Sequence, residues 1–188
     1  MYSASAGIPG SSHPHPSVPG LGTLGGVTEL RLHLCFVCSG NICRSPMAAL
    51  VFAEHLRRER LDGLVRVTSA GTGPWHVGEP ADPRARQTLL GHGYPVAHVA
   101  SQVDAGHLEA DLLLAADAGH LRTLRQKVTD PARVRLLREF DPTAAPGAEV
   151  PDPYYGGDEG FDEVIAMIER TVPGLLDWVR QELGTLQG

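Results

Sequence analysis

Residues 35–46 read Cys-Phe-Val-Cys-Ser-Gly-Asn-Ile-Cys-Arg-Ser-Pro and contain all three cysteines of the 188-residue chain. An apolar run of strand length, residues 30–37, leads into this stretch. Pro46 ends it, and proline is well tolerated at the first position of a helix. The stretch therefore predicts a strand, a short loop and a helix in succession, which is the repeating unit of α/β folds with a parallel sheet.

The rest of the chain alternates in the same way between strand and helix patterns. Three more strands are predicted, at residues 65–69, 111–116 and 133–137. Helices are predicted at residues 46–60, at 83–91 after the capping residue Asp82, at 118–128, and from Phe161 onward. Pro173-Gly174 is expected to break or kink this last helix before residues 175–183. The sequence thus predicts one α/β domain over residues 30–188, with three layers and a four-stranded parallel sheet flanked by helices.

Residues 1–29 have a different composition from this domain. They contain six Gly, five Ser and four Pro, with no lysine or arginine. Such a segment buries too little apolar surface to offset the entropy of ordering, so a disordered tail is expected. It lacks the basic start and apolar centre of a signal peptide. His13 and His15 have no cysteine or carboxylate near them, and no metal site is predicted.

Composition limits the class of protein. The net charge of −6 argues against binding to nucleic acid, which requires a basic face. No run of about 18 apolar residues exists that would span a membrane. Clustered thiols in a chain otherwise free of cysteine suit a reducing compartment, so a cytoplasmic location is expected. A group of basic residues is expected on a solvated helix and strand edge, namely Arg122, Arg125, Lys127, Arg133, Arg135 and Arg138.

The loop from Cys38 to Ser45 has the residue types that would hold a phosphate and attack its phosphorus. Backbone N–H groups of a loop that enters a helix can surround a tetrahedral dianion. Arg44 provides a planar fork for two phosphate oxygens. The helix start, the amides and Arg44 all favour a thiolate at Cys38, and Ser45 can donate a hydrogen bond to its sulfur. The backbone of the bowl would come from Ser39, Gly40, Asn41, Ile42 and Cys43. Gly40 permits positive φ and a close approach of the backbone to a ligand, and Asn41 adopts the left-handed conformation easily.

Other uses of the cysteines fit less well. Cys35-x-x-Cys38 has the spacing of a thioredoxin pair or half a zinc site, but Cys35 falls inside the apolar strand. Side chains three positions apart on a strand point to opposite faces, and a second pair of zinc ligands is missing. Cys35 is therefore interpreted as a core residue. A nucleotide-binding P-loop is excluded, because no Gly-Lys-Ser/Thr follows the glycine.

The full string Cys-x-Gly-Asn-x-Cys-Arg-Ser-Pro resembles the signature of the low-molecular-weight protein tyrosine phosphatases. That resemblance requires an Asp-Pro-Tyr loop just before the last helix, and residues 151–155 read Pro-Asp-Pro-Tyr-Tyr. The likeness runs over about residues 31–184. It is greatest to the actinobacterial branch, through SAGTGPWHVG, GHGYP, FDP, DPYYG and PGLLDWV. One position differs: His120 stands where many members carry Asn, which puts a loop contact in doubt.

The resemblance implies a protein-tyrosine phosphatase that needs no metal or cofactor. Cys38 would attack phosphorus, and Asp152 would serve as general acid and then as general base. Trp75, Tyr154 and Tyr155 would line the pocket of a monomer that acts on phosphotyrosine proteins. Either tyrosine is a candidate target for a tyrosine kinase. The resemblance also suggests that Cys43 pairs with Cys38 under peroxide.

Three rival functions are considered. Arsenate reductases share the nucleophile loop but relay oxidation through later cysteines, and none follows Cys43. Protein arginine phosphatases usually place threonine where this chain has Ile42. A non-catalytic phosphotyrosine-binding module would be expected to lose Cys38 or Asp152, and both are present.

Overall fold

A computed structural model describes residues 30–186 of the chain. The predicted tail at residues 1–29, including His13 and His15, lies outside the described residues. Four parallel strands form one sheet in the order β2-β1-β3-β4. Their bounds are β1 Leu32–Cys38, β2 Val65–Gly71, β3 Leu112–Ala115 and β4 Val134–Leu136. The predicted parallel sheet of four strands is therefore confirmed.

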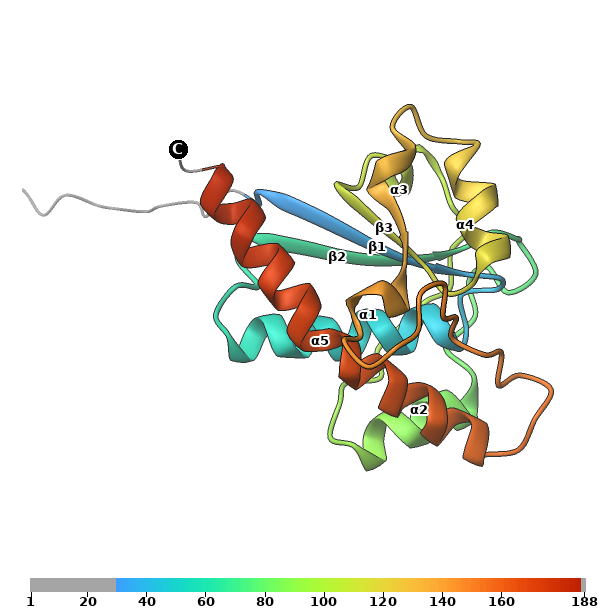
Figure 1. Cartoon of the computed structure of the whole chain (residues 1–188). Helices are drawn as coiled ribbons and strands as arrows, with labels where there is room; N and C mark the ends of the chain where they lie inside the picture. Colours follow the sequence, from blue (N-terminus) through green and yellow to red (C-terminus); the bar gives the residue numbers. More distant parts are fainter. Residues whose placement is uncertain (1–29, 187–188) are drawn as a thin grey trace, which may run out of the picture.

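Helices cover both faces of this sheet (Figure 1). The helices are α1 Arg44–Arg58, α2 Pro83–Gly91, α3 Ala105–Leu108, α4 Ala118–Arg125 and α5 Glu159–Thr185, with short 3-10 turns η1 Pro131–Arg133 and η2 Leu137–Phe140. The larger core cluster lies under α1, α2 and α5, and the smaller one under α4. Cys38 belongs to the first cluster and Cys35 to the second, so the two side chains take opposite faces of β1 as predicted.

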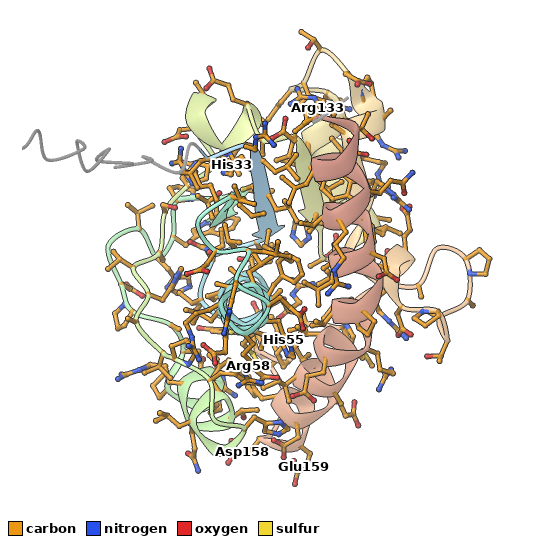
Figure 2. All side chains as sticks on the ribbon, turned by 90° about the vertical axis from the view of Figure 1, so that its left-hand side faces the viewer. His33, His55, Arg58, Arg133, Asp158 and Glu159 are labelled. Carbon is orange, nitrogen blue, oxygen red and sulfur yellow. The ribbon has the colours of Figure 1, made fainter. Side chains whose placement is uncertain are left out.

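Helix α5 crosses α1 and closes the larger core (Figure 1). Figure 2 shows the two helices together, with His55 and Arg58 labelled on α1 and Asp158 and Glu159 at the start of α5. The Tyr94 hydroxyl joins them, because it donates to Glu169 of α5 at 2.9 Å and lies 3.3 Å from His55 Nε2. None of the helices in the described part of the chain is long and apolar enough to cross a membrane.

Of the expected break or kink at Pro173-Gly174, the break does not occur, because α5 runs without interruption through both residues. A proline inside a helix costs about 3 kcal/mol. The segment beyond the proline buries four aliphatic side chains, each contributing about 1.5–3 kcal/mol: Leu175, Leu176, Val179 and Leu183. Packing therefore outweighs the proline. Gly174 lies against the Phe140 backbone, where a Cβ atom would overlap the carbonyl oxygen, so glycine lets α5 approach η2.

The helices also differ from the sequence prediction. Helix α1 begins at Arg44 rather than at Pro46, which brings Arg44 and Ser45 into its first turn. Helix α3 was not predicted, because four residues are too few to show a helical period. The predicted Asp82 cap of α2 is confirmed, since its side chain accepts a hydrogen bond from the Arg84 N–H at 2.8 Å.

Replacing Asp141 with asparagine is expected to lower the free energy of unfolding by about 2 kcal/mol at neutral pH. Asp141 lies after η2, fully buried, and accepts hydrogen bonds from Thr143 at 2.6 and 2.9 Å and from Arg138 at 3.2 Å. Burial alone would raise the pKa of Asp141, but these bonds and Arg170 outweigh it and lower the pKa to about 2.

The sign of the pH dependence follows from that lowered pKa. The ordinary value is 3.8, so the folded carboxylate contributes stability above that pH and loses it as the pH falls toward about 2. Urea unfolding of wild type and Asp141→Asn at about pH 7 and about pH 3 measures the difference. It should shrink at the lower pH, and an equal difference at both values would contradict this account.

Candidate active site

The predicted loop and the Asp-Pro-Tyr loop meet at the carboxyl end of β1, around a cavity of about 520 Å³. Ligand sites of open parallel sheets lie at this edge. The lining comprises Cys38, Ser39, Gly40, Ile42, Cys43, Arg44, Trp75, His76, Asp152, Tyr154 and Tyr155. Of the residues that the sequence singled out, Asn41 and Ser45 do not line the cavity but lie buried behind the loop. The structure adds His76, which the sequence analysis did not identify.

Cys38 ends β1 and is buried, with its Sγ atom 3.0 Å from Ser45 Oγ. The Asn41 amide donates to the same Oγ atom at 2.8 Å. Because the Ser45 oxygen already accepts a hydrogen bond from Asn41, the hydroxyl hydrogen of Ser45 is free to point at the Cys38 sulfur. The alternative acceptor, the Ala70 carbonyl, is farther away at 3.4 Å. The predicted hydrogen bond from Ser45 to the Cys38 sulfur therefore has the geometry that it needs.

Asn41 holds the loop from behind in a left-handed conformation, with φ of 57° as predicted. Its amide also donates to Ser69 Oγ at 2.9 Å, and its carbonyl side chain accepts the Ser101 N–H at 2.9 Å. His98 Nε2 lies 2.7 Å from the Asn41 backbone oxygen. Ser69, Ser101 and His98 are therefore supports of the loop that sequence reasoning missed, since they come from β2 and the segment after α2.

Gly40 lies directly under the His76 ring. Its φ is not positive, so the left-handed conformation that glycine permits is not used there. A Cβ atom at Gly40 would lie 2.8 Å from Cδ2 of the His76 ring. A larger residue at this position would therefore have to displace that ring from the loop.

Arg44 is buried and holds the two sides of the cavity together. Its Nη1 atom donates to Asp117 Oδ2 at 3.0 Å and to the Val150 carbonyl at 3.3 Å. Its Nη2 atom donates to Asp152 Oδ2 at 2.9 Å and to Ser39 Oγ at 3.3 Å. The fork predicted for phosphate oxygens thus lies between the loop and the Asp152 carboxylate.

The two other cysteines are held as neutral thiols. Burial raises the pKa of Cys35 to about 12, in agreement with its interpretation as a core residue. Burial also raises the pKa of Cys43, with Asp82 adding to the effect. Cys43 nevertheless lines the cavity beside Cys38. A thiolate is therefore disfavoured at both positions that flank Cys38 in the sequence.

Aromatic side chains form the mouth of the cavity. Trp75 is 68% exposed and Tyr155 92% exposed. Tyr154 packs edge-on against Tyr155 with ring centroids 5.0 Å apart, and its ring lies 6.3 Å from that of His76. All three predicted wall residues thus belong to the cavity, with His76 between the loop and the Tyr154 ring. Large apolar faces around a polar floor suit a ligand that has an aromatic ring and a charged end.

His120 makes the loop contact that its departure from Asn had put in doubt. It is buried on α4, with Nε2 2.9 Å from Ser39 Oγ. Its Nδ1 atom lies 3.0 Å from Asp117 Oδ1 but is misaligned for a hydrogen bond. Burial lowers the pKa of His120, and Arg44 adds to this, while Asp117 opposes it. The Ser39 oxygen accepts a hydrogen bond from Arg44, which leaves the Ser39 hydroxyl hydrogen free to be donated. A neutral His120 ring can accept that hydrogen bond at Nε2.

Replacing His120 with leucine is expected to lower kcat/KM toward an aryl phosphate by up to about 10-fold, because the half-buried Ser39 hydroxyl loses its acceptor and one hydrogen bond contributes about 0.5–1.5 kcal/mol. His120→Asn should lose much less, since its amide can still accept from Ser39. Steady-state kinetics of both variants, with melting temperatures as a folding control, measures the difference. Equal losses in the two variants would show that the hydrogen bond to Ser39 is unimportant.

Comparisons with known proteins show which family the chain is similar to. A family model described as "Low molecular weight phosphotyrosine protein phosphatase" matches residues 33–185. The chain is 57% identical over 153 residues to "Low molecular weight protein-tyrosine phosphatase A" of Mycobacterium tuberculosis, covering 81% of this chain and 94% of that one. It is 50% identical over 155 residues to a low molecular weight protein-tyrosine-phosphatase of Streptomyces coelicolor, covering 80% and 94%. The predicted likeness to the actinobacterial branch is confirmed.

A solved structure extends the comparison to the fold. The crystal structure of a protein tyrosine phosphatase from Entamoeba histolytica matches with a TM-score of 0.76 and 32% identity, covering 80% of this chain and 97% of that chain. The matched part of the chain includes the whole cavity lining, from Cys38 to Tyr155. The chain therefore belongs to the low molecular weight protein-tyrosine phosphatase family.

Proposed function

We propose that this phosphatase hydrolyses phosphotyrosine through a cysteinyl-phosphate intermediate, with Cys38 as nucleophile and Asp152 as general acid and base. The observation that carries the proposal is the position of Arg44. Its guanidinium bonds to Ser39, next to Cys38, and to the Asp152 carboxylate, so that nucleophile and acid face one cavity. A phosphate placed there would meet a sulfur on one side and a carboxyl group on the other.

The first chemical step forms a sulfur–phosphorus bond. The Cys38 thiolate attacks phosphorus in line, the bond to the phenolic oxygen breaks, and Asp152 gives its proton to that oxygen. Amides of residues 39–43 and the Arg44 fork stabilise the equatorial oxygens of the transition state. A phosphate dianion would replace Asp152 as the partner of one Arg44 nitrogen, which frees the carboxyl group to carry its proton.

The second step restores the enzyme. Asp152, now a carboxylate, takes a proton from a water molecule as the water attacks phosphorus. The sulfur–phosphorus bond breaks, the Cys38 thiolate is regenerated and inorganic phosphate leaves. The hydrogen bond from Ser45 supports this step, because it stabilises the departing thiolate.

The wall residues support a preference for phosphotyrosine. Trp75, Tyr154 and Tyr155 provide aromatic faces for a phenyl ring. Ile42 lines the cavity with an apolar side chain, where arginine phosphatases usually have threonine. Phosphotyrosine proteins are therefore the proposed substrates. Tyr155 is accessible enough for a tyrosine kinase, whereas Tyr154 is only 39% exposed. Pairing of Cys43 with Cys38, a monomeric state and a cytoplasmic location stay predictions.

Replacing Asp152 with alanine is expected to lower the rate of hydrolysis about 10²- to 10⁴-fold, the usual contribution of a general acid. The loss should be greatest for phosphotyrosine, whose phenolate leaves poorly without a proton, and least for p-nitrophenyl phosphate. Single-turnover measurements with both substrates test this, with phosphoarginine as a third substrate. An equal loss of rate for both aryl phosphates would show that Asp152 is not the general acid. Faster hydrolysis of phosphoarginine than of phosphotyrosine by the wild type would overturn the proposed specificity.

A further inference from the structure

Arg84, the second residue of α2, is tied to the phosphate loop. Its Nε and Nη2 atoms donate to the two Asp82 oxygens at 3.0 and 2.9 Å. The Asp82 side chain also accepts the Arg84 N–H at 2.8 Å, and this pairing lowers the pKa of Asp82. The Asp82 N–H in turn donates to the Ile42 carbonyl at 2.9 Å. The guanidinium plane is thus set by a residue that is bonded to the loop around Cys38.

The other edge of the same guanidinium holds the loop that carries Asp152. Nη2 donates to the Tyr154 carbonyl at 3.1 Å and Nη1 to the Gly156 carbonyl at 3.0 Å. The Tyr154 N–H donates to Asp152 Oδ1 at 3.2 Å. Within residues 30–186, no other side chain bonds to a carbonyl of residues 152–158. Arg84 therefore reaches the candidate acid through a single residue, Tyr154.

Aromatic packing fixes the arginine between the two loops. The guanidinium carbon lies 4.7 Å from the Phe161 ring centroid on α5 and 5.9 Å from the Tyr154 ring centroid. Such contacts limit the rotamers of a long side chain and orient its donors. An ordinary surface ion pair with Asp82 would need neither the two carbonyl bonds nor the two rings.

We propose that Arg84 is a positioning residue for Asp152: it couples the acid loop to the phosphate loop and sets the approach of the carboxyl group to the leaving oxygen. This inference rests on the proposed role of Asp152 as general acid. It predicts a specific defect, because a misplaced acid slows poor leaving groups while the nucleophile and the phosphate contacts stay in place.

The test compares Arg84→Gln with Arg86→Gln, a matched control on the same helix whose exposed side chain makes no hydrogen bond to the described residues. Values of kcat/KM are measured for a series of aryl phosphates, from p-nitrophenyl phosphate to phosphotyrosine. Arg84→Gln should lower the value for phosphotyrosine about 10- to 100-fold and that for p-nitrophenyl phosphate much less. Arg86→Gln should match wild type across the series. Asp82→Asn, which releases Arg84 from the other side, should shift the series in the same direction as Arg84→Gln.

Asp152→Ala, measured in parallel, separates the two hypotheses. If it shows a steep dependence on the leaving group and Arg84→Gln does not, the role of Arg84 is overturned while the proposed mechanism stands. If Asp152→Ala lowers kcat/KM equally for all leaving groups, Asp152 is not the general acid, and the proposed role of Arg84 is excluded as well. Melting temperatures show whether a variant has a folding defect. If Arg84→Gln has one, Arg84→Lys replaces it, because lysine keeps the charge but cannot reach both carbonyls. Its dependence of kcat/KM on the leaving group should lie between those of wild type and Asp152→Ala.

Discussion

Replacing Cys38 with serine is expected to abolish turnover while phosphotyrosine still binds. Removal of a catalytic nucleophile from another well-studied hydrolase costs on the order of 10⁶-fold in kcat. A serine hydroxyl is a far weaker acid than a thiol, so it would stay protonated and attack phosphorus poorly. The loop amides and Arg44 are unchanged, so the phosphate contacts remain.

Two measurements check this expectation. Single-turnover hydrolysis of an aryl phosphate gives the loss of rate, and calorimetric titration with a phosphotyrosine peptide gives the affinity. Cys35→Ala is the matched control, because Cys35 is a buried core cysteine on the opposite face of β1. That control should keep the wild-type rate. Substantial turnover by Cys38→Ser would exclude a covalent cysteinyl intermediate.

Replacing Arg44 with alanine is expected to have the next largest effect. Arginines that stabilise the charge of phosphoryl transfer contribute about 10³- to 10⁵-fold to kcat, and a loss of about 10⁴-fold is expected here. The variant also removes the shared cation from two carboxylates: that of Asp152, which lines the cavity, and that of Asp117, which lies behind Arg44. Their negative field opposes the entry of a phosphate dianion, so KM should rise as kcat falls.

Arg44→Lys distinguishes charge from shape. Lysine restores the cation but cannot bond to Ser39, Asp117 and Asp152 at once, so its rate should fall between those of wild type and Arg44→Ala. Arg122→Ala removes an exposed arginine from α4 and serves as the control for net charge. Phosphate inhibition constants for all three variants report the affinity of the bowl. If Arg44→Lys equals wild type, the planar fork has no special role.

Much of this architecture could be predicted from the sequence, because the signals are local. Apolar runs and helical spacing placed β1 and α5, and Asp82 marked the start of α2. The glycine, asparagine and arginine around Cys38 predicted a loop for phosphate from residue types alone. The helix break that Pro173-Gly174 could cause does not occur, because the buried side chains that follow it outweigh the cost of the proline.

By itself, then, the sequence determined the order of the four strands and the four longer helices, the family, and the two loops that line the cavity, around Cys38 and around Asp152. Only the tertiary structure decided which distant groups meet. Arg44 contacts Asp117 and Asp152, which lie 73 and 108 positions later in the chain. Arg84 reaches the Tyr154 carbonyl across 70 positions, and His120 reaches Ser39 across 81. The physical reason is range: propensities and caps act over a few residues, whereas these contacts depend on how the sheet and its helices pack as a whole.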